Sequence, residues 1–189
     1  HEINGITYAM LKYTYGTNGI RVPYGKEYVV NVWSYSAGSE YEAYKEVVKK
    51  DVMAIRDKVD ILMVAMHWGV EYTHTPTQYE RDQANYLASL GVDIVIGTHP
   101  HVIQPVEWID DTIVFYSLGN FISAQYQNQD SCYNYKCVIG LMSSLDITKR
   151  EYKGETSITI DNIKNELIYT YYSNWANFRV IPFSNKEIV

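Results

Sequence analysis

Histidines in two short segments carry the clearest chemical signal in this sequence. His67 begins the segment HWGVE, which ends at Glu71. His99 and His101 flank Pro100 in the segment GTHPH. Neutral imidazole nitrogens are common ligands of zinc, manganese and iron, and a nearby carboxylate can act as a general base toward a bound water. These residue types predict a divalent-metal site with the three histidines as ligands and Glu71 as a candidate catalytic residue.

The elements around these segments explain how residues 32 positions apart could meet. The runs Ile61–Met66 and Val92–Ile96 are apolar, which is typical of strands buried on both faces. Between them, Thr77 and Glu80 form a capping box for a helix that is expected to stop at Gly91. Strand, helix and strand in about 35 residues predict a βαβ unit with parallel strands. The carboxyl ends of neighbouring parallel strands lie about 5 Å apart at one sheet edge, so the histidines are expected to converge there.

Purely structural interpretations compete with the metal hypothesis. A single histidine at a strand end usually makes one hydrogen bond, and Glu71 fits a surface carboxylate as well as a base. Pro100 is expected to hold the preceding His99 in an extended conformation. In the segment SLGNF, Asn120 fits a tight turn, which we favour, although its amide could face the same site as a second candidate catalytic residue. His74, in a threonine-rich loop, is expected to be solvated.

The rest of the chain is read from its patterning. Before the βαβ unit, the residue types predict two strands, Ile6–Tyr15 and Tyr28–Trp33, and then a helix that begins with a capping box at Ser39. After Pro105 the pattern predicts a hairpin (Val106–Trp108 and Thr112–Ser117) and then antiparallel strands at Lys136–Ile147, Glu155–Ile160, Glu166–Tyr172 and Arg179–Phe183. The polar stretch Gln125–Tyr135 is expected to be a mobile loop.

Composition limits the kinds of partner. The 189 residues carry 16 Lys and Arg against 22 Asp and Glu, a net charge of −6, so nucleic acid is not expected as a partner. The longest purely apolar run has six residues, whereas a membrane-spanning helix needs about 20. Cys132 and Cys137 could form a disulfide in an oxidising compartment or remain free thiols.

Three longer segments closely resemble the bacterial capsule-synthesis CapA family, whose members include PgsA-like proteins of poly-γ-glutamate capsule production. These segments are HWGVEY from His67, followed by Pro76 and Gln78, then GVDIVIGTHPHVIQP from Gly91, and YSLGNFI from Tyr116. The resemblance covers about residues 4–123. It implies one domain over residues 1–123, the second half of the family's domain, and a β-rich extension over residues 124–189 packed on it.

The resemblance also implies a fold class. We expect an α/β protein with a calcineurin-like metallophosphoesterase-type β-sandwich flanked by helices, here incomplete. By analogy with those enzymes, His99 and His101 stand in the place of a Gly-His-x-His motif, and His67 in the place of the upstream histidine ligand. The family's amino-terminal acidic ligands are not expected in this chain, so a two-metal centre would need a missing amino-terminal segment or a partner chain.

The implied function is a role in the synthesis, export or cell-surface retention of a poly-γ-glutamate capsule. The alternative is a metal-dependent hydrolase, with manganese, zinc or iron, that cleaves a phosphoester or a γ-glutamyl amide. The expected partners are poly-γ-glutamate or capsule-synthesis membrane proteins. The expected location is the extracellular face of the bacterial cell membrane, with an anchor in a segment outside this chain.

Overall fold

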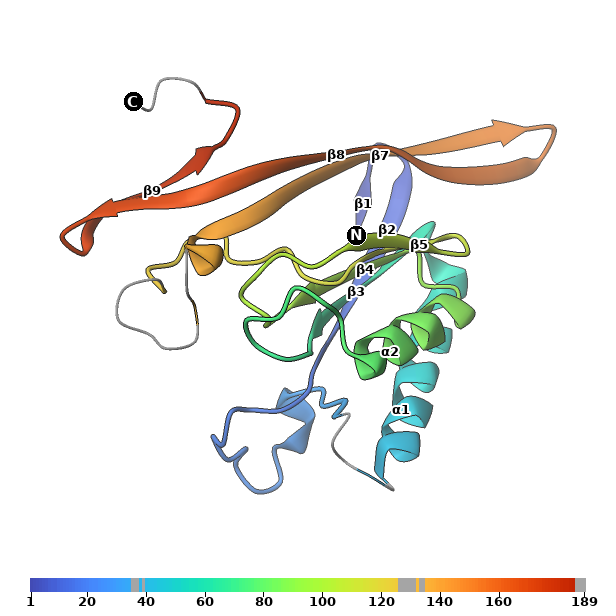
Figure 1. Cartoon of the computed structure of the whole chain (residues 1–189). Coiled ribbons are helices and arrows are strands. Elements are labelled where there is room, and N and C mark those ends of the chain that lie inside the picture. The colour runs from blue at the N-terminus through green and yellow to red at the C-terminus, as the bar shows by residue number, and fades with distance from the viewer. Residues whose placement is uncertain (35–37, 39, 126–131, 133–134, 186–189) are drawn as a thin grey trace. The chain divides into compact units, whose positions relative to one another are not determined.

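The computed structural model describes residues 1–34, 38, 40–125, 132 and 135–185 (Figure 1). The chain forms two compact units and passes between them several times. The first unit comprises His1–Val70, Thr75–His99 and Pro105–Tyr116, and the second comprises Glu71–His74, Pro100–Gln104 and the chain from Ser117. Each unit is described by itself below.

The first unit is built on a six-stranded mixed sheet. Its strand order is β1-β2-β3-β4-β6-β5, with bounds β1 (Glu2–Ile3), β2 (Ile6–Thr14), β3 (Ile61–His67), β4 (Ile94–Thr98), β5 (Val106–Ile109) and β6 (Thr112–Phe115). Neighbours from β2 to β6 run parallel, whereas β1 and β5 pair antiparallel at the two edges. The predicted βαβ unit and the predicted hairpin are therefore confirmed.

Two helices cover one face of this sheet (Figure 1). They are α1 (Glu40–Ile55) and α2 (Gln78–Ser89), and short 3-10 turns occur at η1 (Glu27–Val29) and η2 (Arg56–Lys58). The predicted capping box of α2 is present, with the Thr77 hydroxyl and the Glu80 carboxylate each accepting a backbone N–H of the other residue. The predicted start at Ser39 lies outside the described residues. Val52 of α1 and Leu87 of α2 join the same buried core as Val64 of β3.

The expectation that β3 is buried on both faces is wrong. Leu62, Val64 and Met66 are buried against the helices, whereas Met63 and Ala65 on the opposite face are only half-buried. Both helices contribute to one core cluster, so the helix-covered face is the more completely excluded from water.

The expected strand at Tyr28–Trp33 is also absent. The chain forms η1 there, and only Val32 makes an isolated bridge, to Thr14 of β2. The apolar residues of this segment instead lead to Trp33. Its side chain is buried in the core, and its backbone N–H donates to the Thr14 carbonyl at 2.8 Å. A single anchoring aromatic residue and a strand cannot be told apart by composition in so short a run.

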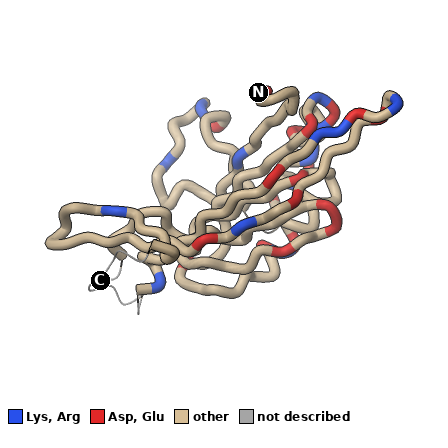
Figure 2. Tube along the Cα trace, turned by 90° about the horizontal axis from the view of Figure 1, so that it is seen from above, with Lys and Arg blue, Asp and Glu red and all other residues tan. Residues whose placement is uncertain are grey.

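The second unit contains a three-stranded antiparallel sheet in the order β7-β8-β9, with β7 (Ile139–Tyr152), β8 (Glu155–Ser173) and β9 (Ala176–Pro182). The expected break at 161–165 does not exist, because β8 continues through it. Asn162 has a φ of 52°, and the pairing shifts register between Ser144 and Asp146. The polar residues there face solvent along an exposed ribbon rather than marking a turn. Figure 2 shows charges of both signs scattered along β7 and β8.

The two cysteines form a disulfide in the second unit. Cys132 and Cys137 are both buried and have Cα atoms 6.0 Å apart, and Cys137 lies in the 3-10 turn η3 (Lys136–Val138). Most of the expected mobile loop Gln125–Tyr135 lies outside the described residues. Among the helices that are described, none is long and apolar enough to cross a membrane.

Candidate functional site

In the first unit, three neighbouring strands end at the same level. Thr14 of β2, His67 of β3 and Thr98 of β4 are register partners across the sheet. The ladder continues one residue further, because the Trp68 N–H donates to the Thr98 carbonyl at 3.1 Å and the Tyr15 N–H donates to the His67 carbonyl at 2.9 Å. His67 therefore lies in the middle of the carboxyl edge of the sheet, where open α/β sheets bind ligands.

Three aromatic rings gather at this edge. The His67 and His99 ring centroids are 4.6 Å apart, and both rings contact Tyr15, at 5.7 and 4.7 Å. The Tyr15 ring lies nearly parallel to that of His67, with an interplanar angle of 10°. The structure thus brings together two of the three predicted ligands within the first unit. Tyr15 was not singled out from the sequence, and only its position as the last residue of the predicted strand Ile6–Tyr15 could have drawn attention to it.

The backbone of His99 differs from the expectation. Its φ is 99°, not the extended value that Pro100 was expected to impose. A following proline disfavours the right-handed helical region, but it leaves positive φ available. A non-glycine residue in this region costs about 1–3 kcal/mol and persists only when its surroundings determine it. Here the His99 ring is packed beside those of His67 and Tyr15.

Close packing behind this edge excludes larger residues. The Trp68 indole is buried and donates to the Tyr116 carbonyl at 2.9 Å. A Cβ atom at Gly97 would overlap both that carbonyl oxygen and the indole nitrogen. Gly69 has a φ of 83°, and a side chain there would overlap the buried carboxylate of Glu80. Gly69, two residues after His67, and Gly97, two residues before His99, are therefore required by sterics.

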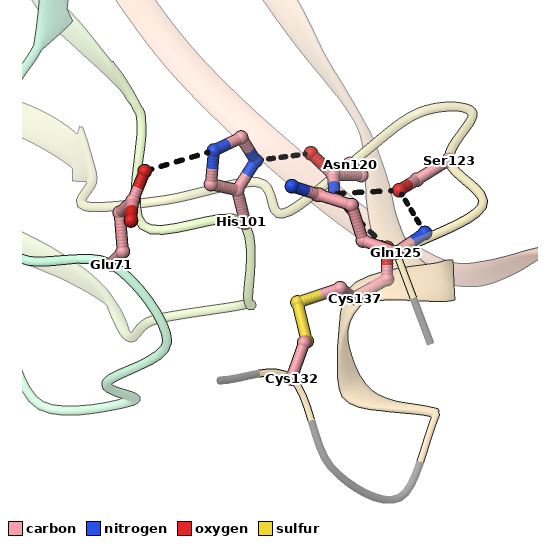
Figure 3. The surroundings of a disulfide bond; sticks show 7 residues. All are labelled: Glu71, His101, Asn120, Ser123, Gln125, Cys132 and Cys137. Carbon is pink, nitrogen blue, oxygen red and sulfur yellow. Dashed lines mark hydrogen bonds and ion pairs between the residues drawn. A yellow bond between two sulfur atoms is a disulfide. The ribbon is translucent and has the colours of Figure 1, made fainter. Parts of the chain in front are cut away.

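In the second unit, His101 is held by three neighbours, of which Figure 3 shows Glu71 and Asn120. Its Nδ1 lies 2.9 Å from Oδ1 of Asn120, and its Nε2 lies 3.7 Å from Oε1 of Glu71. The Tyr72 ring stacks on it with centroids 5.9 Å apart. Burial first, and the negative charge of Glu71 second, raise the pKa of Tyr72. The Tyr72 side chain that stacks on His101 is therefore uncharged. Two of the predicted site residues, Glu71 and Asn120, thus contact His101.

The bonds of Asn120 define which nitrogen of His101 carries the proton. Asn120 Nδ2 donates to the carbonyl of Cys137 and to Oε1 of Gln125, both at 2.9 Å (Figure 3). Its Oδ1 therefore faces His101 and can only accept, so Nδ1 of His101 must donate. In neutral His101 the Nε2 lone pair then lies on the side of Glu71.

The favoured interpretation of Asn120 as a turn residue only was incomplete. Gly119, with a φ of 68°, makes the turn, and the Asn120 amide makes the bond to His101. Sequence reasoning missed the role of Cys137, whose carbonyl orients that amide, because the contact spans 17 residues. His74 is exposed, as expected, and its Nδ1 lies 2.7 Å from the Ile103 carbonyl.

The donor groups of each unit bear on the metal prediction. The first unit by itself offers two imidazoles, and the second offers one imidazole and the Glu71 carboxylate. Catalytic zinc sites generally have three protein ligands, so among the described residues neither pair is a full set by itself. The chemistry of both pairs fits a divalent transition metal, and the metal site stays a prediction.

Parallel strands linked by a helix, with imidazoles at their carboxyl edge, define an α/β protein with a candidate site at its strand ends. Residues 1–125 match the model of the family described as "Bacterial capsule synthesis protein PGA_cap". The chain belongs to this family, which confirms the resemblance seen in its sequence. The matched residues contain every predicted site residue, whereas β7, β8 and β9 lie outside the match.

Two named relatives agree with this assignment. The chain is 32% identical over 124 residues to the "PGA biosynthesis protein CapA" of Bacillus subtilis (strain 168). The matched segment covers 66% of this chain and 30% of that protein. It is 36% identical over 84 residues to the "Capsule biosynthesis protein CapA" of Bacillus anthracis. That match covers 42% of this chain and 20% of that protein. The chain therefore spans less than a third of the length of either relative.

Proposed function

We propose that this chain acts in the biosynthesis of a bacterial capsule of poly-γ-glutamate at the cell surface. The observation that carries the proposal is the family match over residues 1–125, together with two relatives named for capsule or PGA biosynthesis. The disulfide between Cys132 and Cys137 supports a location outside the cytoplasm, because disulfides persist in oxidising compartments. Its partners would be the polymer itself or capsule-synthesis membrane proteins, and an anchor in another segment would hold it at the extracellular face of the membrane.

A segment exchange tests this role. Residues 1–125 would replace the matched segment of the Bacillus subtilis relative, in a strain that otherwise lacks that relative. Polymer released and retained by the cells would be measured beside an exchange that carries Gly97→Trp, which the packing around Gly97 forbids. Restored polymer with the first exchange only supports the proposal. No polymer from a chimaera that accumulates at normal levels would contradict it.

We also propose that the fold is the metallophosphoesterase-type β-sandwich flanked by helices. The support is the uneven burial of β3, whose Met63 and Ala65 lie on the face opposite the helices and are only half-buried. In a β-sandwich a second sheet packs about 10 Å from such a face. A crystal structure of a full-length relative with no second sheet over the positions of Met63 and Ala65 would contradict this fold.

A second candidate function is metal-dependent hydrolysis of a phosphoester or a γ-glutamyl amide. The observation that favours it is the set of oriented imidazoles: His67 and His99 with rings 4.6 Å apart, and His101 with Nδ1 bonded to Asn120. Manganese, zinc or iron at these histidines would supply Lewis-acid polarisation of the oxygen under attack. Glu71 would accept a proton from the attacking water, and Asn120 would hold His101 in the tautomer with the proton on Nδ1.

Metal content measured by elemental mass spectrometry tests this second candidate. The protein would be purified without chelator beside the double variant His99→Ala/His101→Ala, with His74→Ala as the matched control because His74 is exposed and bonded to a carbonyl. We expect about one or two ions per chain in the parent and in the control, and none in the double variant. Equal metal content in all three proteins, or none in any, would contradict the metal site.

A further inference from the structure

The hairpin formed by β8 and β9 ends in an exposed tryptophan. Ser173 and Ala176 are register partners, so Asn174 and Trp175 form a two-residue loop. Their φ angles are 50° and 56°, and positive φ at both positions is what a tight type I′ hairpin turn requires. Asn-Gly is the usual pair in such a turn, because a bulky residue at positive φ is strained. The Trp175 side chain is 64% exposed, so burial in a core does not offset this strain.

Trp175 belongs to a cluster of aromatic rings at this tip. The Tyr172 ring centroid lies 5.8 Å from that of Trp175, and it stacks on the ring of Phe178 at 4.8 Å. The neighbouring Tyr171 points to the opposite face of the hairpin and is 40% exposed. The guanidinium group of Arg179 lies 5.6 Å from the Tyr171 ring centroid. Both faces of the tip therefore present aromatic rings to solvent.

Acidic residues are absent from this hairpin. The chain contains 22 Asp and Glu, yet Arg179 is the only charged residue in the sequence from Ile168 to Phe183. Figure 2 shows the hairpin with one basic position and no acidic one. Tyr171 and Tyr172 also line a largely apolar pocket of about 450 Å³. The hairpin thus combines exposed aromatic and apolar surface with a local charge opposite to the net charge of −6.

We propose that the tip of the β8–β9 hairpin inserts into the interface of a phospholipid bilayer, with Trp175 at its centre. Tryptophan and tyrosine concentrate at this interface because their rings are apolar while their N–H and O–H groups still reach water or headgroups. A tip without carboxylates is not repelled by lipid phosphates, and Arg179 adds an attractive charge. A projecting turn with rings on both faces also fits a layer that surrounds it better than a concave small-molecule site.

This contact rests on the proposed location at the extracellular face of the membrane and adds a second point of attachment to it. β8 and β9 lie outside the family match over residues 1–125, so the contact belongs to the extension alone. An anchor in another segment would hold the chain near the bilayer, and the hairpin would then fix the orientation of the second unit at its surface.

Co-sedimentation with vesicles of phosphatidylcholine and phosphatidylglycerol, at physiological salt, tests the proposal on the full chain. We expect the partition coefficient to fall about tenfold in Trp175→Gly, because one large apolar side chain is lost. Glycine is the residue that this turn favours, so stability to urea should change little. Trp108→Thr is the matched control, because Trp108 of β5 is also a tryptophan with a 48% exposed side chain.

Tryptophan fluorescence gives a second measurement of the same contact. The chain has four tryptophans, of which Trp33 and Trp68 are buried whereas Trp108 and Trp175 are exposed. In Trp108→Thr the exposed tryptophan is Trp175 alone, so a blue shift of the emission on adding vesicles reports its transfer out of water. We expect this shift in Trp108→Thr and none in the double variant Trp108→Thr/Trp175→Gly.

Each outcome has a defined meaning. Vesicle binding and a blue shift that persist in Trp108→Thr and are lost with Trp175→Gly support the membrane contact. No vesicle binding, as expected if the tip docks on a protein instead, would overturn it. Equal binding of Trp175→Gly and the parent would overturn it as well, and so would binding that depends on Arg179 alone in Arg179→Gln, which is electrostatic adsorption.

The capsule role is tested separately, because the segment exchange uses residues 1–125 and so lacks the hairpin. Polymer made by that chimaera, with no vesicle binding by the full chain, refutes the membrane contact only. Vesicle binding that depends on Trp175, with no polymer from the chimaera, refutes the capsule role only.

Discussion

The hydrogen bonds of Asn120 allow a prediction with a worked magnitude. Asn120→Ala removes three bonds of 2.9 Å, to His101, to the Cys137 carbonyl and to Gln125. A typical hydrogen bond contributes about 1 kcal/mol net, and Asn120 is half-buried, so we expect the free energy of unfolding to fall by about 2–3 kcal/mol. Urea denaturation followed by circular dichroism measures this change.

The same substitution should change His101 in a way that a loss of packing alone would not. Without the Asn120 oxygen, Nδ1 of His101 loses its acceptor, so the preference for the Nδ1–H tautomer should weaken. Nitrogen chemical shifts of the imidazole report the tautomer directly. A tautomer that is unchanged in Asn120→Ala would refute the assignment, whatever happens to stability.

Asn85→Ala is the matched control for the stability measurement. Asn85 is an exposed asparagine on α2 whose amide donates to the Arg81 carbonyl of its own helix, at 2.7 Å. Its removal should change the free energy of unfolding by no more than about 0.5 kcal/mol. A loss as large as that of Asn120→Ala would mean that the three bonds of Asn120 are not the cause.

Two further predictions concern the first unit. Gly97→Ala places a methyl group on the Tyr116 carbonyl and the Trp68 indole, and we expect a loss of about 1–3 kcal/mol in urea denaturation, whereas Gly16→Ala, where a Cβ meets nothing within 4 Å, should lose less. Burial, and then the charge of Asp82, raise the pKa of Tyr41 to about 12 from 10.0. Above pH 10 the unfolded chain ionises first, so stability should fall as the pH rises from 10 to 12; Tyr41→Phe should flatten this fall, and an identical pH profile would contradict the shift.

The βαβ unit was predictable because its signals are local. An apolar run, a capping box and a terminal glycine each lie within a few residues, and the rule that parallel strands end at one edge then places His67 beside His99. The strands of the second unit were harder to bound. Asn162 and Asn165 look like turn residues, yet they lie within β8 because a solvent-exposed ribbon tolerates polar residues that a buried strand would not.

The link between Asn120 and His101 shows where sequence reasoning stops. Gly119 and Asn120 together are a familiar turn signal, and that signal is correct for the glycine. The asparagine amide is oriented by the Cys137 carbonyl, and the position of that carbonyl depends on a disulfide that the sequence left open. A role that depends on such a tertiary contact produces no periodic pattern in the sequence. The residues of this family that set histidine tautomers should therefore be sought among turn residues at strand ends, where a local explanation already appears sufficient and hides the second role.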